Sequence, residues 1–81
     1  MTFRLLSRPG CHLCEDLATE LTSLGIEFDT VDIDTDDDLI RRYGFEIPVL
    51  FLGDTEIIRA PVAPSALRTA LAGAGVAVAG H

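Results

Sequence analysis

The chain has 81 residues, which predicts one domain, and its 48% hydrophobic and 23% charged residues are typical of a globular protein. The net charge of −7 argues against a nucleic-acid partner, which requires a basic face, and it disfavours anionic membrane surfaces. No apolar run is long enough to cross a bilayer, and the first residues do not form a secretory signal. We therefore expect a cytoplasmic protein that binds no membrane.

The first part of the chain predicts a strand, a helix and a second strand. Residues 2–7 form a short apolar run that ends before a Pro-Gly turn, which predicts a buried strand. From Cys11 on, apolar residues recur at helical spacing, and Gly25 is the expected end of this helix. Residues 26–33 alternate in hydrophobicity, with one irregularity, and predict the second strand. The residues expected to face the core from this strand are Ile26, Phe28, Val31 and Ile33.

An acidic stretch at residues 34–38 precedes a second predicted helix. Thr35 and Asp38 fit a capping box, the acidic first turn suits the positive end of a helix dipole, and Gly44 is the expected end. Three alternating aspartates also have the opening spacing of an EF-hand loop: Asp32, Asp34 and Asp36. However, the glycine and glutamate that such a loop needs at its sixth and twelfth positions are missing. We therefore interpret the stretch as a capping turn and expect no metal site.

The second half of the chain predicts a hairpin followed by a third helix. Residues 47–52 predict a strand entered through a proline, and Gly53-Asp54 suits a two-residue turn with glycine at its first central position. Residues 55–59 predict the antiparallel partner strand, and the prolines that follow lead into a helix at residues 65–71. The segment 73–81 is rich in Gly and Ala and has little to pack, so we expect a flexible tail.

Most of the large aromatic and aliphatic side chains of the predicted strands are expected in the core. This applies to Phe3, Phe28, Leu50 and Phe51. Tyr43 and Phe45 lie near Pro48 in the sequence, where they would be close enough to border a substrate groove. Packing is the more frequent role of such residues, so we expect both to be packed.

Two cysteines, Cys11 and Cys14, carry the candidate chemistry. A loop this short restrains little unfolded-state entropy, and a structural zinc site needs four ligands, so neither role explains the pair well. The start of a helix stabilises a thiolate, so we expect Cys11 to be the exposed nucleophile and Cys14 the buried resolving thiol. Arg8 either adds a cationic partner or is simply an exposed arginine. Because Glu15 and Asp16 oppose the stabilisation, we expect only a moderately depressed pKa for Cys11.

Residues 7–14, Ser-Arg-Pro-Gly-Cys-His-Leu-Cys, resemble the active-site segment of glutaredoxins, in which a basic residue stands three positions before the first cysteine. Ile47-Pro48 resembles the dipeptide that carries the cis-proline of the thioredoxin superfamily. The resemblance implies an α/β thioredoxin-like fold over residues 1–72, in the order β-α-β-α-β-β-α, with a four-stranded mixed sheet flanked by helices. It also implies a cis Ile47–Pro48 bond that faces the cysteines and presents the Ile47 backbone to a substrate chain.

The same resemblance implies a thiol–disulfide oxidoreductase that reduces protein or glutathione mixed disulfides and binds no cofactor tightly. Its catalytic residues are expected to be Cys11 and Cys14. The expected substrate-binding residues are Arg8, His12, Leu13, Ile47 and Pro48. His12 either tunes the thiolate or points to solvent, and the sequence leaves both alternatives open.

Glutathione is the expected co-substrate, a disulfide-containing protein is the expected partner, and the chain is expected to be a monomer. Residues 59–65, however, lack the Gly-Gly pair and the aspartate with which glutaredoxins hold the γ-glutamyl end of glutathione. A second hypothesis is therefore a redox-inert or redox-sensing binding module of the same fold, which recognises its partner through a groove at Pro48.

Overall fold

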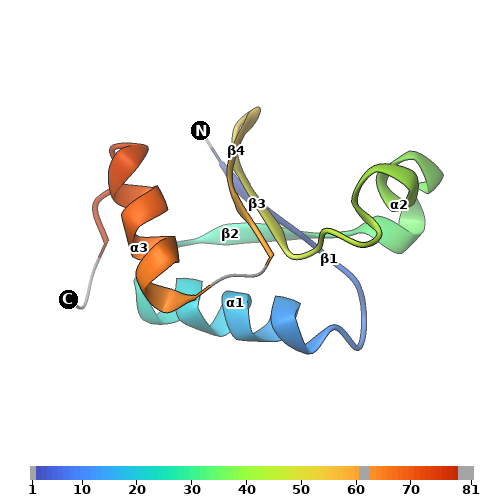
Figure 1. Ribbon diagram of the computed structural model, residues 1–81, viewed down its shortest axis with the longest axis horizontal. Coiled ribbons are helices and arrows are strands. Elements are labelled where there is room, and N and C mark those ends of the chain that lie inside the picture. The colour runs from blue at the N-terminus through green and yellow to red at the C-terminus, as the bar shows by residue number, and fades with distance from the viewer. Residues whose placement is uncertain (1, 61–62, 79–81) are drawn as a thin grey trace.

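The computed structural model describes residues 2–60 and 63–78, which form a four-stranded mixed sheet and its helices (Figure 1). The elements in chain order are β1 (Phe3–Ser7), α1 (His12–Ser23), β2 (Phe28–Asp32), the short 3₁₀ helix η1 (Ile33–Thr35), α2 (Asp37–Tyr43), β3 (Val49–Leu52), β4 (Thr55–Arg59) and α3 (Pro64–Gly73). The sheet order is β2-β1-β3-β4, with β1 parallel to β2, and with β3 antiparallel to both β1 and β4. The predicted element order is confirmed.

The central strand β1 has one face toward each core cluster, because successive side chains of a strand point to opposite sides. Leu5 and its register partner Leu50 belong to the larger cluster, which α1 and α3 cover. Leu6 and its register partner Val49 belong to a smaller cluster. The other buried members of the larger cluster are Leu17, Leu21, Leu24, Ile26, Leu67 and Leu71. Most of the buried apolar surface therefore lies between the sheet, α1 and α3.

Helix α2 covers the smaller cluster only thinly. Its seven residues, all within the described part of the chain, include no fully buried side chain, although Leu39, Ile40 and Tyr43 pack partly against Leu6, Ile33 and Val49. In Figure 1, α1 runs along the sheet and α3 lies near one end of the molecule, whereas α2 lies at the opposite end. No helix within the described ranges has the length and apolar character needed to cross a bilayer.

The β3–β4 hairpin turns where the sequence predicts, at Gly53-Asp54. Gly53 has φ of +60°, a left-handed conformation that glycine adopts without a steric cost, and the strands pair from Leu52 and Thr55 onward. The predicted core aromatics are confirmed as half-buried residues packed against the two clusters, and Leu50 is fully buried.

The start of α2 differs from the predicted capping box. Its N-cap is Asp36, whose carboxylate accepts a hydrogen bond of 2.9 Å from the N–H of Asp38. Thr35 instead ends η1, and its hydroxyl donates to the Asp32 carbonyl at 2.8 Å. The inserted 3₁₀ turn after β2 moves the helix start forward by one residue, which the periodicity of the sequence does not show.

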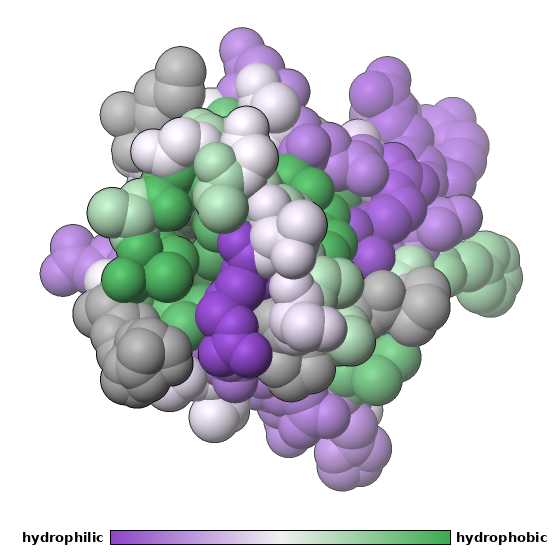
Figure 2. All heavy atoms as spheres, turned by 60° about the vertical axis from the view of Figure 1, so that its left-hand side comes forward, coloured by the Kyte–Doolittle hydropathy of each residue, from purple (hydrophilic) through white to green (hydrophobic). Residues whose placement is uncertain are grey.

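The prediction that residues from 73 on have little to pack is wrong for the segment that the structure describes. Helix α3 extends to Gly73, and Val76 and Val78 pack partly buried against the larger cluster. The Val76 N–H also donates to the Leu71 carbonyl at 3.0 Å. Residues 79–81 lie outside the described residues, and the flexibility of the tail stays a prediction. Viewed from the α3 side, a hydrophilic strip divides the hydrophobic surface (Figure 2).

Candidate active site

Cys11 occupies the N-cap position of α1, so its sulfur lies at the positive end of the helix. The residue has an extended conformation, and its Sγ accepts a hydrogen bond of 3.2 Å from the backbone N–H of Cys14. The preceding Gly10 has φ of +81°, which turns the chain from the end of β1 into α1. A loop-to-helix junction thus presents the first sulfur to one of the free N–H groups of the first helical turn.

The two cysteines are close together and differ in exposure. They form a disulfide, with their Cα atoms 5.3 Å apart. Cys14 is only 4% exposed, because the helix turns it toward the core, whereas Cys11 is half-buried at the helix end. This is the asymmetry expected of an accessible first cysteine and a shielded second one.

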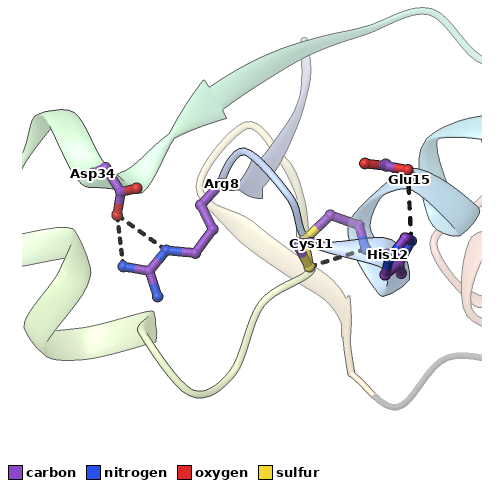
Figure 3. The surroundings of a disulfide bond; sticks show 6 residues. Arg8, Cys11, His12, Glu15 and Asp34 are labelled. Carbon is purple, nitrogen blue, oxygen red and sulfur yellow. Dashed lines mark hydrogen bonds and ion pairs between the residues drawn. A yellow bond between two sulfur atoms is a disulfide. The ribbon is translucent and has the colours of Figure 1, made fainter.

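Arg8 lies against Asp34 and points away from the cysteine sulfur (Figure 3). Its Nη2 and Nε atoms donate to Asp34 Oδ1 at 2.6 and 3.0 Å. This hydrogen bond raises the pKa of the already basic guanidinium, and the negative charges of Asp34 and Asp32 add to the effect. The cationic partner that the sequence offers to Cys11 is therefore engaged elsewhere in this disulfide-bonded state.

The Arg8–Asp34 pair follows from the parallel pairing of β1 and β2. Ser7 and Asp32 are register partners at the carboxyl ends of these strands, and Arg8 and Asp34 come just after them. Because parallel strands end at the same edge of a sheet, the two side chains meet there. The sequence analysis treated Asp34 as part of a capping turn and missed this role.

His12 points to solvent in this oxidised state, and its role in tuning the thiolate stays a prediction. Its side chain is 93% exposed, and its Nδ1 atom lies 3.9 Å from Glu15 Oε1 (Figure 3). Both residues belong to the first turn of α1, where they project from the same face at a spacing of three residues. The acidic side chain that the structure places beside His12 is therefore Glu15.

The peptide bond between Ile47 and Pro48 is cis, as the resemblance implies. Pro48 is fully buried, and its carbonyl accepts a hydrogen bond of 3.0 Å from the Ala60 N–H. The Ile47 N–H, however, donates to the Tyr43 carbonyl at 3.2 Å. The expectation that the whole Ile47 backbone is offered to a substrate chain therefore needs correction, because its donor already has a partner inside the protein.

A groove of about 380 Å³ lies between one face of α1, Pro48 and α3. Four of its lining residues are apolar and two are carboxylates: Leu13, Leu17, Pro48, Leu67, Asp16 and Glu20. The groove brings together Leu13 and Pro48, two of the residues predicted to bind substrate. Asp16 and Glu20 were not predicted as groove residues, although their spacing of four on a helix was a usable signal.

Tyr43 and Phe45, both expected to pack, differ in the structure. Tyr43 is half-buried and its ring meets that of Phe51 edge to face, with centroids 6.0 Å apart. Phe45 is fully exposed, so the expectation for this residue is wrong. It lies in the short turn between α2 and the cis peptide, outside the helix and the strand that flank this turn.

The acidic turn does not gather ligands for a metal ion. The Asp32 carboxylate accepts a hydrogen bond of 2.9 Å from the Asp34 N–H, and Asp36 caps α2 in the same way. Across residues 2–60 and 63–78, no group of three or more His, Cys, Asp or Glu residues is placed to hold a metal. The interpretation of these aspartates as capping residues is confirmed for Asp32 and Asp36.

The mixed sheet, the Cys-x-x-Cys pair at the start of α1 and the cis proline before β3 define a member of the thioredoxin-fold class. The sequence model of the Glutaredoxin-like domain (DUF836) matches residues 2–72. The chain therefore belongs to this glutaredoxin-like family. Among curated proteins, none matches the chain.

Solved structures of similar chains agree with this assignment. The XcR50 protein of X. campestris is 30% identical, with 89% of this chain and 97% of that chain covered at a TM-score of 0.80. Ne2328 of Nitrosomonas europaea is 28% identical, with 84% and 87% covered at a TM-score of 0.71. NrdH-redoxin of Escherichia coli, a glutaredoxin-like protein, is 20% identical, with 85% and 93% covered at 0.65, and shows the shared fold.

Proposed function

We propose that this protein is a dithiol thiol–disulfide oxidoreductase in which Cys11 is the nucleophile and Cys14 the resolving thiol. The observation that carries the proposal is the placement of the Cys11 sulfur at the N-cap of α1, where it accepts the Cys14 N–H at 3.2 Å. The same hydrogen bond and the helix dipole favour the thiolate once the disulfide is reduced. The shielded Cys14 is one helical turn away, within reach of a disulfide.

The reaction begins with the reduced dithiol. The Cys11 thiolate attacks one sulfur of the substrate disulfide, and the other substrate sulfur leaves as a thiolate that takes up a proton. The Cys14 thiol then loses its proton and attacks the Cys11 sulfur of the mixed disulfide. This releases the second substrate thiol and forms the Cys11–Cys14 disulfide seen in the structure. Two electrons pass from the protein to the substrate.

The sharpest test of this mechanism is a pair of cysteine variants with a disulfide-bonded peptide as substrate. Cys14→Ser is expected to accumulate the mixed disulfide on Cys11, detected by mass spectrometry of the intact protein. Cys11→Ser is the matched control, because it keeps one thiol but removes the accessible one, and it should react far more slowly. Turnover by Cys14→Ser at the rate of the unmodified protein would contradict the dithiol mechanism.

A redox titration measures whether the pair works in the range of known enzymes. We expect a reversible Cys11–Cys14 disulfide with a potential between about −180 and −270 mV when the protein is equilibrated in graded glutathione buffers. Mass spectrometry counts the reduced, disulfide and glutathionylated forms in the same samples. Cysteines that stay reduced and unmodified throughout would contradict the proposal and favour a redox-inert binding module.

We further propose that the protein acts in the cytoplasm, as a monomer, on a disulfide-containing protein or on glutathione. In a reducing compartment, two vicinal thiols remain available for exchange, which supports the assignment. Glutathione stays a candidate co-substrate, and its accumulation on Cys11 in the titration would support that role.

A further inference from the structure

The groove beside the cysteines has an apolar floor and an acidic rim. Leu13, Asp16, Leu17 and Glu20 follow one another on α1 at spacings of three and four residues, so they share one face of the helix. Leu17 is buried, whereas Leu13 remains 56% exposed at the end of α1 that carries the cysteines. An exposed leucine at the mouth of a groove leaves apolar surface in water that a bound side chain would cover.

The position of Leu13 connects this groove to the reacting sulfur. Leu13 lies between Cys11 and Cys14 in the sequence, on the first turn of α1. Pro48 and Leu67 of α3 also line this groove. When the disulfide of a polypeptide substrate reaches Cys11, a side chain next to the substrate cysteine can therefore enter the groove.

The charges around the groove and Cys11 are mostly negative. Asp16 and Glu20 line the groove, and Glu15 is exposed on the first turn of α1. The cation nearest in sequence before Cys11, Arg8, is held by both of its donating nitrogens on Asp34. The net charge of the whole chain, −7, has the same sign. A positively charged substrate is thus favoured, and an anionic one meets like charge.

We propose that the groove binds a cationic polypeptide disulfide, which places an apolar side chain against the exposed Leu13 and basic side chains at Asp16 and Glu20. The inference rests on the proposed dithiol function and adds the class of substrate. Glutathione disulfide, which carries more carboxylates than amines and no large apolar side chain, is a poor fit to this surface. Arg8, the cation that could receive one of its carboxylates, is already paired.

The test compares two short peptides with the same leucine beside a single cysteine, held as a mixed disulfide with 2-mercaptoethanol. One peptide has flanking lysines and the other has flanking glutamates. The reduced protein is mixed with each peptide, and mass spectrometry of quenched samples gives the second-order rate constant. We expect the lysine peptide to react about tenfold faster at low salt, and the ratio to fall as salt screens the charges.

Two double variants locate this preference on the groove. Asp16→Asn with Glu20→Gln should lower the lysine-to-glutamate rate ratio about fivefold, a modest factor because Asp16 is exposed and Glu20 is only half-buried. Glu27→Gln with Asp29→Asn makes the same change of net charge at exposed positions that do not line the groove, beside and in β2. This control should leave the ratio within about twofold, since distant surface charges are screened.

The outcomes separate this inference from the proposed function. Equal rates with the two peptides, or an equal loss of preference in both double variants, overturn the cationic-substrate inference and leave the dithiol mechanism intact. Failure to reduce either peptide overturns the mechanism. In that case, fluorescence anisotropy of dye-labelled peptides with serine in place of cysteine decides whether the groove binds. Tighter binding of the lysine peptide, lost only in the groove variant, supports the docking surface, and equal binding overturns it.

A third variant tests the role of Asp34 as a positioning residue for Arg8. Asp34→Asn removes the negative charge that holds the guanidinium, so Arg8 becomes available to an anionic substrate. We expect the rate with glutathione disulfide to rise about threefold and the lysine-to-glutamate ratio to fall. An unchanged rate with glutathione disulfide and an unchanged ratio would overturn this part of the inference.

Discussion

The two faces of the sheet are held together in different ways. On the face that carries α1 and α3, apolar side chains from both helices and the sheet form the larger, fully buried cluster. On the other face, α2 packs with half-buried residues, and its surroundings contain several exposed ion pairs. These pairs join Asp38 to Arg41 and Arg42, and Arg59 to Glu46 and Glu56. The cysteines are therefore attached to the part of the protein that apolar burial stabilises most.

Because of this difference, the position of the cysteine sulfurs and the charges near them depend on different interactions. Cys14 and Leu17 are buried on α1, so the helix that carries the cysteine pair is fixed by the larger cluster. Asp34, which holds Arg8, belongs to η1 at the edge of the thinner face. Exposed charge pairs respond to pH and are screened by salt, whereas apolar burial carries no charge to titrate or screen. We therefore expect the cysteines to stay in place while pH and salt change the electrostatic potential around them.

The largest predicted effect contrasts one leucine from each face. Leu21→Ala, in the larger cluster and fully buried, should lower the free energy of unfolding by about 3 kcal/mol. Leu39→Ala, on α2 and only half-buried, should cost about 1 kcal/mol because less apolar surface and a smaller cavity are involved. Urea unfolding followed by circular dichroism measures both.

A milder substitution at Leu21 is also needed, because the free energy of unfolding of a domain of this size is only about 5 kcal/mol. Leu21→Met conserves volume and should cost less than about 1.5 kcal/mol, which keeps the protein folded for comparison. Equal losses of unfolding free energy for Leu21→Ala and Leu39→Ala would show that the two faces of the sheet contribute equally to stability. This result would contradict the difference inferred from burial.

A smaller effect is expected at the N-terminus of α2. Asp36→Ala removes the side-chain hydrogen bond to the Asp38 N–H and should cost about 1 kcal/mol. Asp37→Ala is the matched control, since it removes one carboxylate from the same turn without removing the cap, and should cost about 0.3 kcal/mol. Hydrogen exchange should show faster opening of the α2 amides in Asp36→Ala, with α1 unchanged. Faster exchange in both helices would indicate that the two faces open together.

The order of the helices and strands could be predicted from local patterns in the sequence, whereas the arrangement of the sheet came from the resemblance to glutaredoxins. Leucine spacing from Leu13 to Leu24 gives the length of α1, and Gly53-Asp54 gives the hairpin, because both signals act over a few residues. The exposure of the two cysteines also follows from their place on the first helical turn. Contacts between distant parts of the chain were harder: the packing of Val76 and Val78 depends on where α3 ends, which composition alone does not specify.

The candidate site was predicted less completely than the fold. The cysteine pair and the cis Ile47–Pro48 bond came from recognisable short motifs. The Arg8–Asp34 pair joins residues 26 positions apart, and it becomes visible only when β1 and β2 are paired in parallel register. The hydrogen bond from the Ile47 N–H to the Tyr43 carbonyl was also missed, because it depends on how the turn after α2 folds back. Whether the Arg8 side chain and the Ile47 N–H are available to a substrate thus depends on how the chain folds, which short sequence motifs do not show.

The smallest predicted effect concerns Glu56 and Arg59 of β4, beside α2. The hydrogen bond from Arg59 lowers the pKa of the Glu56 carboxyl below its ordinary value of 4.5, and the guanidinium also lies 5.9 Å from the Tyr43 ring centre. Because the folded-state pKa is depressed, the stabilisation is fully present above the unfolded value and is lost as the pH falls through the folded one. The difference in urea midpoint between the unmodified protein and Glu56→Gln should therefore shrink between about pH 5 and pH 3. The change should be small and should disappear at high salt, because the pair is largely exposed. A difference that stays constant over this range would show that the ion pair adds nothing to the stability of the thinner face.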